Sequence, residues 1–278
     1  MVRFATMSLI AFASFEGHMA LPCLTDQEVY RSADRPAAWF ARHNPGLVFY
    51  AKMAAVVWSA SRLAEQGRYN GAAWIRSSLT VVRALESVGG SFDIQNLNVI
   101  QKLTSPCVFI GNHMSILETF VLPCLIRPHR KVTFVVKQSL MAYPRFGQVL
   151  RSRNPVVVGR ENPREDLRMV LEEGQRRLAA GVSVIIFPQT TRSVEFDPQR
   201  FNSLGVKLAR RCRVPIVPVA LKTDAWGLGK RIKDFGRISP GKRVYICFGE
   251  PLSVDGAGKE EHNHVMDFIA AHLNAWQR

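Results

Sequence analysis

From residue 91 onward, short apolar runs alternate with amphipathic stretches, and this alternation is the strongest constraint on the fold. The apolar runs predict strands at residues 92–100, 107–112, 131–137, 154–160, 182–188, 214–221 and 243–249. Apolar spacings of three and four predict helices at residues 115–126, 164–181, 201–211 and 260–276. Strands that alternate with helices indicate an α/β fold, with a mixed, largely parallel sheet flanked by helices. Functional groups in such sheets gather in loops beyond the carboxyl ends of the strands.

Residues 36–90, which precede this region, read as an N-terminal helical hairpin. The first helix is expected from about residue 37 to residue 64, with a break at Asn44-Pro45, and the second from about residue 72 to residue 88. Trp, Phe and Arg side chains together are typical of an amphipathic helix that lies in a membrane interface. The alternative is an ordinary pair of core-facing helices packed on the following domain. Residues 1–35 have no pattern that we can assign.

Membrane spanning is disfavoured by the length of the apolar stretches. The best candidate, residues 46–60, falls short of a spanning helix and carries Lys52. The sequence therefore predicts a peripheral or monotopic protein.

The balance of charge points to an anionic partner. Lysine and arginine outnumber aspartate and glutamate by 37 to 22, a formal net charge of +15. Basic residues concentrate at 127–168, with ten against three acids, and at 207–243, with eleven against two. No nucleic-acid-binding motif accompanies them, so an anionic membrane surface is the better explanation. The five cysteines form no C-x-x-C pair, which argues against a metal site and favours a reducing compartment.

The stretch FIGNHMSILE places His113 five positions before Glu118. Within one helix these side chains would point about 140° apart. Ser115-x-x-Glu118, however, is a capping-box pattern, with Ser115 at the N-cap and Glu118 three residues into the helix. His113 would then precede the helix, where Glu118 can reach back and orient its imidazole as a general base. The alternative is a capping glutamate beside an unrelated loop histidine.

Further motifs follow in order. The run ending in Arg160, the segment FPQTTRS at residues 187–193 and the strand VPIVPVA at residues 214–220 come after the histidine motif. In this order and spacing the chain resembles the glycerolipid acyltransferases, above all the 1-acylglycerol-3-phosphate (lysophosphatidic acid) acyltransferases. Residues 137–147 and FGEPLS at residues 248–253 agree with this resemblance, which covers roughly residues 92–275. The resemblance makes residues 91–278 the acyltransferase domain.

Three positions depart from the family pattern. Glu118 stands in place of the family's aspartate, which lengthens the reach of the acid by one methylene group. Gln189 replaces a glutamate and keeps hydrogen bonding without the charge. Thr190 replaces a glycine, and a threonine does not readily take the positive φ that glycine allows. These departures put the acceptor preference in doubt more than the reaction class.

The resemblance implies transfer of a fatty acyl group from a thioester, acyl-CoA or acyl-carrier protein, to the hydroxyl of a lysophospholipid. It implies no metal and no bound cofactor. His113 would be the base and Glu118 its orienting acid, with the first-turn helix amides near a developing oxyanion. Residues expected to bind substrate are Asn112, Lys137, Arg160, Gln189, Thr191, Arg192 and Ser193. Such an enzyme belongs on the cytoplasmic face of a membrane, where acyl thioesters occur.

Two other readings are compatible with the sequence. The same chemistry could serve another acceptor, such as a lyso-ornithine or a lysophosphocholine lipid. The altered third motif also allows a non-catalytic lipid-binding scaffold that kept the fold.

Overall fold

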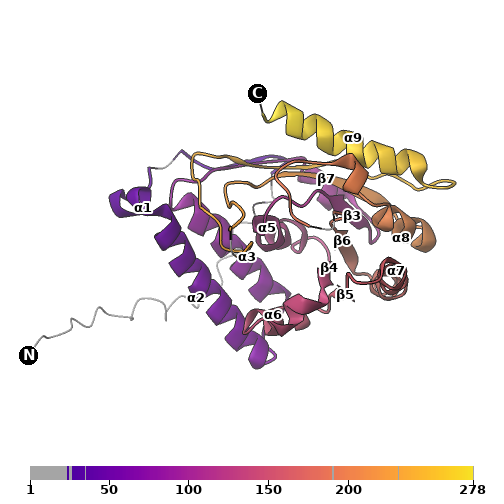
Figure 1. Ribbon diagram of the computed structural model, residues 1–278, viewed down its shortest axis with the longest axis horizontal. Helices are drawn as coiled ribbons and strands as arrows, with labels where there is room; N and C mark the ends of the chain where they lie inside the picture. The colour runs from indigo at the N-terminus through magenta and orange to yellow at the C-terminus, as the bar shows by residue number, and fades with distance from the viewer. Residues whose placement is uncertain (1–23, 25–26, 35, 190, 231, 278) are drawn as a thin grey trace, which may run out of the picture.

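The computed structural model describes residues 24, 27–34, 36–189, 191–230 and 232–277 (Figure 1). Within these residues, one eight-stranded sheet forms the centre of the molecule. Its strands are β1 (Tyr30–Arg31), β2 (Phe92–Gln95), β3 (Val108–Gly111), β4 (Val132–Lys137), β5 (Val156–Val158), β6 (Ser183–Ile186), β7 (Ile216–Lys222) and β8 (Val244–Phe248).

The strands lie in the order β1-β2-β8-β7-β3-β6-β4-β5. The pairs β1–β2 and β7–β8 are antiparallel. The other five pairs are parallel, which confirms the predicted mixed, largely parallel sheet. Because β3, β6 and β7 run the same way, their carboxyl ends meet at one edge of the sheet.

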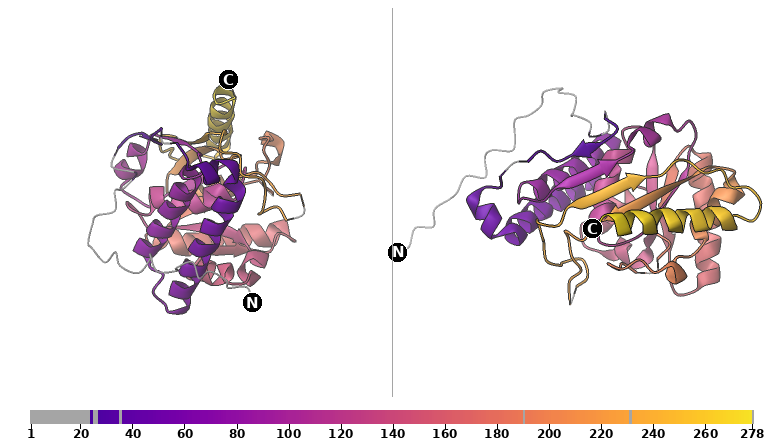
Figure 2. Two further views of the ribbon diagram at one scale, coloured as in Figure 1. Left: turned by 90° about the vertical axis from the view of Figure 1, so that its left-hand side faces the viewer. Right: turned by 90° about the horizontal axis from the view of Figure 1, so that it is seen from above.

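Helices cover both faces of this sheet. They are α1 (Trp39–His43), α2 (Pro45–Glu65), α3 (Gly71–Glu86), α4 (Asn98–Lys102), α5 (Leu117–Ile126), α6 (Phe146–Arg151), α7 (Pro163–Ala179), α8 (Leu204–Cys212) and α9 (Lys259–Ala275). In Figure 1, α9 and α8 lie on one side of the sheet, and α5, α3 and α2 lie on the other. Seen from above, α9 crosses in front of the strands (Figure 2).

The two layers follow from the period of a strand, whose successive side chains point to opposite faces. In β3, Phe109 faces the core shared with α2, α3 and α5, whereas Val108 and Ile110 face the core shared with α7, α8 and α9. All three side chains are buried. A strand covered on both faces reads as a continuous apolar run, as this one does.

The N-terminal helices form as expected, with the break at Asn44-Pro45. Pro45 occupies the first turn of α2, where its missing N–H costs nothing. The inner face of α2, which carries Phe49, Met53 and Val56, is buried in the same core as the sheet. Helices α2 and α3 are therefore joined to the sheet by packing on one face.

The outer face of α2 is also apolar. Leu47, Ala51 and Trp58 lie on it at helical spacing and are exposed. The helix has 21 residues, and by length and composition alone it could cross a membrane. The helix ends at Glu65, close to the expected residue 64, and its length alone does not exclude a membrane span.

One predicted strand is wrong in length. Residues 92–100 were expected to form a single strand, but β2 ends at Gln95 and α4 follows. Asn96 has φ 59°, which ends the extended backbone. Its side-chain amide donates to the carbonyl of Phe248 at 3.0 Å, which compensates for the turn. The sequence pattern also did not predict α6 or β1.

Candidate active site

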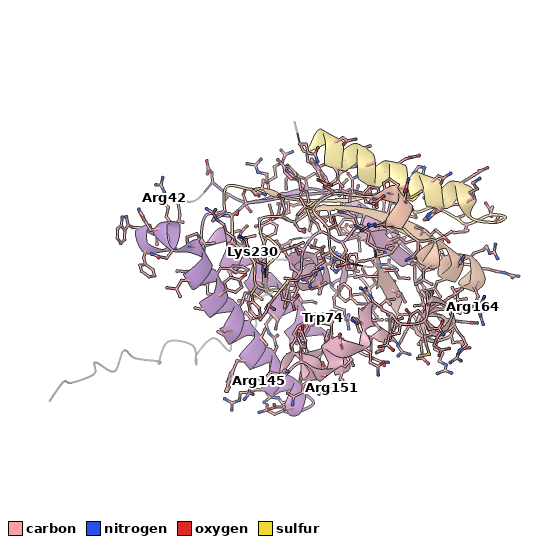
Figure 3. All side chains as sticks on the ribbon, viewed as in Figure 1. Arg42, Trp74, Arg145, Arg151, Arg164 and Lys230 are labelled. Atoms are coloured by element: carbon pink, nitrogen blue, oxygen red, sulfur yellow. The ribbon has the colours of Figure 1, made fainter. Side chains whose placement is uncertain are left out.

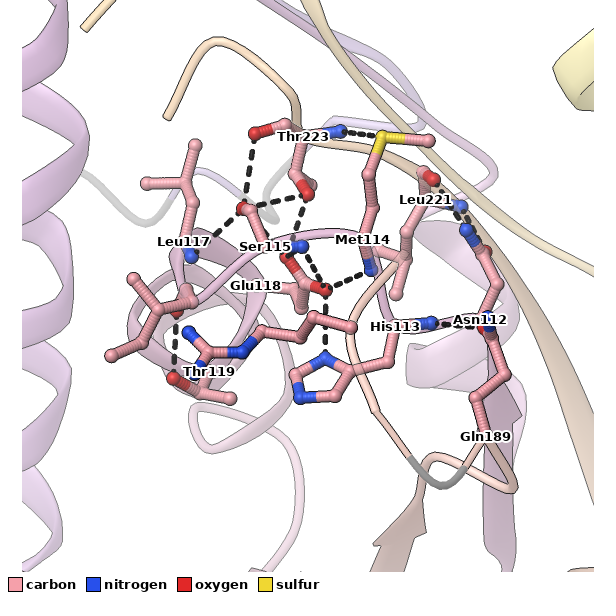
Figure 4. Close-up of polar contacts among 12 residues, drawn as sticks. Asn112, His113, Met114, Ser115, Leu117, Glu118, Thr119, Gln189, Leu221 and Thr223 are labelled. Carbon is pink, nitrogen blue, oxygen red and sulfur yellow. Dashed lines mark hydrogen bonds and ion pairs between the residues drawn. The ribbon is translucent and has the colours of Figure 1, made fainter. Parts of the chain in front are cut away.

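His113 and Glu118 are in contact at the carboxyl end of β3. Nδ1 of His113 lies 2.9 Å from Oε1 of Glu118 (Figure 4). His113 is in the segment between β3 and α5, and Glu118 is in the first turn of α5. The helix begins at Leu117, one residue later than the capping box predicts, but the carboxylate still turns back to the backbone N–H of Ser115. The expected pairing of the two side chains is thus observed.

Glu118 is completely buried and surrounded by donors. The backbone N–H groups of Met114 and Ser115 donate to Oε1 at 2.7 and 2.9 Å. The hydroxyl of Thr223 donates to Oε2 at 2.6 Å, and Ser115 Oγ lies 3.0 Å from the same oxygen. Both carboxylate oxygens are therefore fixed, as an ionised carboxylate in a dry site requires.

This environment keeps Glu118 ionised. Burial by itself raises the pKa of the carboxyl group. The hydrogen bond and charge of His113, the Thr223 hydroxyl and a backbone N–H oppose burial, and the pKa falls below its usual value. A carboxylate at this point accepts a hydrogen bond from Nδ1–H, so the neutral imidazole carries its free lone pair on Nε2.

The ring of His113 is also held from the side. It stacks on Phe187 with ring centroids 4.5 Å apart and planes 4° apart. The His113 side chain is 14% exposed, and Nε2 has no hydrogen-bond partner among the residues described. A ring fixed on its face and at Nδ1 presents Nε2 to a substrate in one orientation.

Several backbone N–H groups near the start of α5 already have acceptors. The N–H groups of Met114 and Ser115, which directly precede the helix, donate to Glu118, and the expected place of the first-turn amides near a developing oxyanion stays a prediction. The N–H of Leu117 donates to Ser115 Oγ at 3.1 Å. The N–H groups just before the helix are therefore satisfied by the Glu118 carboxylate.

Asn112 contacts the neighbouring strand. Its amide nitrogen donates to the carbonyl of Leu221 at 2.7 Å, and its oxygen accepts from the N–H of Leu221 at 2.9 Å. The side chain is buried. Asn112 thus joins β3 to β7 directly before the histidine, and its expected part in substrate binding stays a prediction.

The FPQTTRS segment is bound to the histidine by two contacts. Oε1 of Gln189, which is buried, accepts from the backbone N–H of His113 at 2.6 Å. The backbone N–H of Ser193 donates to the carbonyl of His113 at 3.0 Å. An amide oxygen serves this contact without burying a charge, which explains why Gln189 is tolerated in place of a glutamate. The expectation for the backbone of Thr190 lies outside the described residues.

Arg192 has one partner and one unused nitrogen. Nη2 of Arg192 forms an ion pair with Asp234, which is buried in the segment between β7 and β8. Nη1 is buried and has no hydrogen-bond partner among the described residues. A buried guanidinium nitrogen without an acceptor indicates a place for an anion.

Arg160 lies near enough to Arg192 for their charges to interact. Partial burial and the charge of Arg192 lower the pKa of Arg160, whereas Asp166 raises it. Arg160 has φ 65°, and its N–H donates to Asp166 at 3.1 Å. Two neighbouring guanidinium groups repel each other, and an anion between them would relieve that repulsion.

The other predicted binding residues are Lys137, Thr191 and Ser193. Lys137, the last residue of β4, is exposed. Thr191 is exposed, and its hydroxyl accepts from Nζ of Lys233 at 3.1 Å. Binding roles for Lys137, Thr191 and Ser193 stay predictions.

Two residues of the site, Thr223 and Asp234, were not predicted from the sequence. Thr223 directly follows β7, and a rule that looks beyond the carboxyl ends of strands would have found it. Asp234 lies far from any strand end, and nothing in its local sequence marks it.

The fold and the His113–Glu118 pair can be compared with known protein families. Residues 91–222, just under half of the chain, match the model of the Acyltransferase family, which confirms over these residues the resemblance predicted from the sequence.

Among curated relatives, two are named 1-acyl-sn-glycerol-3-phosphate acyltransferase. One, from Pseudomonas aeruginosa, is 29% identical over 53% of this chain and 54% of its own length. The other, from Cocos nucifera, is 30% identical over 59% of this chain and 51% of its own length. The chain thus spans about half the length of these curated relatives.

A crystal structure shares the fold. That structure, of the 1-acyl-sn-glycerophosphate acyltransferase from Thermotoga maritima, covers 86% of this chain and 97% of its own, with a TM-score of 0.63 and 18% identity.

Proposed function

We propose that the protein transfers a fatty acyl group from acyl-CoA or acyl-carrier protein to the free hydroxyl of a lysophospholipid. The proposed acceptor is 1-acylglycerol-3-phosphate, which gives phosphatidic acid. The observation that carries the proposal is the buried Glu118 carboxylate on Nδ1 of His113, which leaves Nε2 available as a base. The names of the relatives supply the acceptor class.

The reaction requires one base and no covalent enzyme intermediate. Nε2 of His113 removes the proton of the acceptor hydroxyl as its oxygen attacks the thioester carbonyl carbon. The carbon–oxygen bond forms, the carbon–sulfur bond breaks, and the thiolate leaves with the proton from the imidazolium. Glu118 stabilises that imidazolium, as the acid does in serine-type triads. General-base catalysis of this kind contributes about 10²–10⁴-fold.

The acceptor phosphate is proposed to bind at Arg192 and Arg160. The buried Nη1 of Arg192 lacks an acceptor within the described part of the chain. A phosphate oxygen supplies that acceptor, because a guanidinium group binds phosphate through directed N–H groups.

Membrane association is supported by the outer face of α2, which exposes Leu47 and Trp58, and by α1, which exposes Trp39 and Phe40. One face of α2 is packed on the protein, so we propose that it lies in the interface instead of crossing the bilayer. Basic side chains, among them Arg42, Arg145, Arg151 and Arg164, are spread widely over the molecule (Figure 3) and suit the anionic cytoplasmic leaflet.

The first test measures transfer of a labelled acyl group by the purified protein with wild-type and His113→Ala chains. Donors are acyl-CoA and acyl-carrier protein, and acceptors are a panel of lysolipids. Transfer to 1-acylglycerol-3-phosphate by wild type alone supports the proposal. Equal transfer by both chains would remove His113 as the base.

A second test concerns the phosphate. Arg192→Ala is expected to raise the KM for a phosphorylated acceptor with little change in kcat. Arg200→Ala is the matched control, because Arg200 pairs with Asp197 at the exposed surface. An unchanged KM in Arg192→Ala would remove its phosphate role.

One observation favours a different acceptor with the same chemistry. Asp234 neutralises part of the charge of Arg192. If the panel shows transfer only to a zwitterionic lysolipid, the reaction stands and the acceptor changes. Absence of transfer to any acceptor would favour the lipid-binding scaffold.

A further inference from the structure

In the segment between β7 and β8, residues 225–230 and 232–239 form the two limbs of an irregular hairpin, which we call the crossing hairpin. Trp226 and Ile238 form an antiparallel bridge. The N–H of Gly227 donates to the carbonyl of Arg237 at 2.9 Å, and that of Gly229 to the carbonyl of Lys233 at 3.2 Å. The two limbs approach so closely that a side-chain carbon at Gly236 would collide with the backbone of Gly227.

The second limb alternates between two environments. Asp234, Gly236 and Ile238 are buried, whereas Lys233 and Phe235 are exposed. The N–H of Phe235 donates to the carbonyl of Ile232 at 3.0 Å, so the limb begins in a turn, and from Lys233 onward alternate residues face outward and lie on the protein. The two faces carry different chemistry.

The inner face contacts the candidate active site and α2. Asp234 pairs with Arg192, and Trp226 donates from its indole to the carbonyl of Asp234 at 3.1 Å. The hydroxyl of Tyr50 in α2 donates to the carbonyl of Gly236. Contacts of its inner residues therefore hold the hairpin against α2 and the candidate active site.

The outer face is apolar and basic. Ile232 is 57% exposed and Phe235 65% exposed, next to the exposed ammonium groups of Lys230 and Lys233. Large apolar side chains beside lysines are the composition of a surface that enters an anionic lipid interface.

This outer face adjoins the exposed helices. The ring of Phe235 lies 5.7 Å from that of Tyr50. Among the described residues, eight large apolar side chains are exposed, and six of them lie on α1, α2 or the crossing hairpin: Trp39, Phe40, Leu47, Trp58, Ile232 and Phe235. Such concentration in one part of the molecule marks an interaction surface.

We propose that the crossing hairpin is a second lipid-contacting element, which inserts Ile232 and Phe235 into an anionic bilayer surface beside α2. It deepens the membrane association in the proposed function and rests on it. Because the same hairpin holds Arg192 through Asp234, it would place the phosphate site at the level of the lipid headgroups.

The experiment measures sedimentation of the purified full chain with phosphatidylglycerol–phosphatidylcholine vesicles. The double variant Ile232→Ser/Phe235→Ser is expected to lower the vesicle–water partition coefficient about tenfold or more, because it removes apolar area from contact with lipid. Ile232→Leu/Phe235→Trp is expected to retain binding. Lys230→Glu is expected to weaken binding several-fold. Lys207→Glu is the charge control, because Lys207 is exposed on α8, at the opposite end of the molecule from α2 in Figure 1.

Two further readouts separate this inference from the proposed function. The vesicle assay is repeated in a His113→Ala background, where binding does not depend on transfer. Transfer to a short-chain, monomeric acceptor is measured without vesicles, and the Ser variants are expected to match wild type there. Wild-type-like vesicle binding by the Ser variants would overturn the inference. If the Ser variants also transfer more slowly than wild type without vesicles, the inference would be overturned as well. The substitutions would then act on the active site and not on lipid contact. If wild type transfers nothing, the proposed function fails, and the vesicle arm still decides the inference.

Discussion

Thr223 donates its hydroxyl proton to Glu118 at 2.6 Å, across 105 positions of sequence. This contact comes from the end of β7, whereas the histidine that Glu118 orients follows β3. The Glu118 carboxylate is thus held by residues that follow two neighbouring strands of the sheet. The longer side chain of glutamate reaches a partner that lies beyond the histidine loop.

Replacement of Thr223 by valine should lower kcat, because Oε2 of Glu118 loses its shortest hydrogen bond while the shape of the residue is kept. A hydrogen bond to a charged group is worth about 1.5–3 kcal/mol, so a fall of about tenfold or more is expected, with little change in KM. Thr223→Ser keeps the hydroxyl and should restore most of the rate. Steady-state kinetics of both variants provide the measurement, and equal rates in valine and wild-type chains would contradict the role.

Shortening the side chain at position 118 tests whether the longer glutamate is needed to reach Thr223. Glu118→Asp restores the family residue but withdraws the carboxylate from Thr223, so we expect it to be slower than wild type. Glu118→Gln should be slower still, by about 10²-fold or more, because a neutral amide does not stabilise the imidazolium. An aspartate variant as active as wild type would show that the contact with Thr223 is unnecessary.

Stability should fall more steeply in acid for wild type than for Glu118→Gln. The pKa of Glu118 is lower in the folded chain than its ordinary value. The unfolded chain therefore binds more protons, and the stabilisation is complete above the unfolded pKa of about 4.3. It is lost as the pH falls through the folded value. Urea unfolding between pH 7 and pH 3 measures this, and a difference between the chains that stays constant with pH would refute it.

Asp234 should act on the acceptor through Arg192. Asp234→Ala leaves the buried guanidinium without its carboxylate, so a rise of about three- to tenfold in the KM for a phosphorylated acceptor is expected. Asp234→Glu should recover part of the loss. Asp197→Ala is the control, because that residue pairs with an arginine at the surface. A change in kcat alone would contradict this role.

Asn112→Ala should destabilise the fold. It leaves the buried N–H and carbonyl of Leu221 without their partner, at a cost of about 1–3 kcal/mol for each unsatisfied group. Chemical denaturation followed by circular dichroism gives the free energy of unfolding. A loss below 1 kcal/mol would show that the β3–β7 contact is replaceable.

The local contacts of this site could be predicted from the sequence, whereas its contacts between distant residues could not. The five-position spacing of His113 and Glu118, together with Ser115, was enough to predict a histidine ahead of a helix. The contacts of Thr223 and Asp234 join residues 105 and 42 positions away, and no local spacing encodes them.

The same limit applies to the fold. Strand and helix periods identified most elements, because apolar side chains alternate on buried strands and recur on helices. They failed at Asn96, where one left-handed residue ends a strand inside an apolar run.

The alternation of buried and exposed residues in the second limb of the crossing hairpin limits which mutations this segment tolerates. Outer positions such as Phe235 can be exchanged for other apolar residues without disturbing Arg192. Insertion or deletion of one codon upstream of Asp234 would turn the carboxylate outward and a lipid-facing side chain inward. We therefore expect descendants of this sequence to vary here by substitution and to conserve the length of the limb.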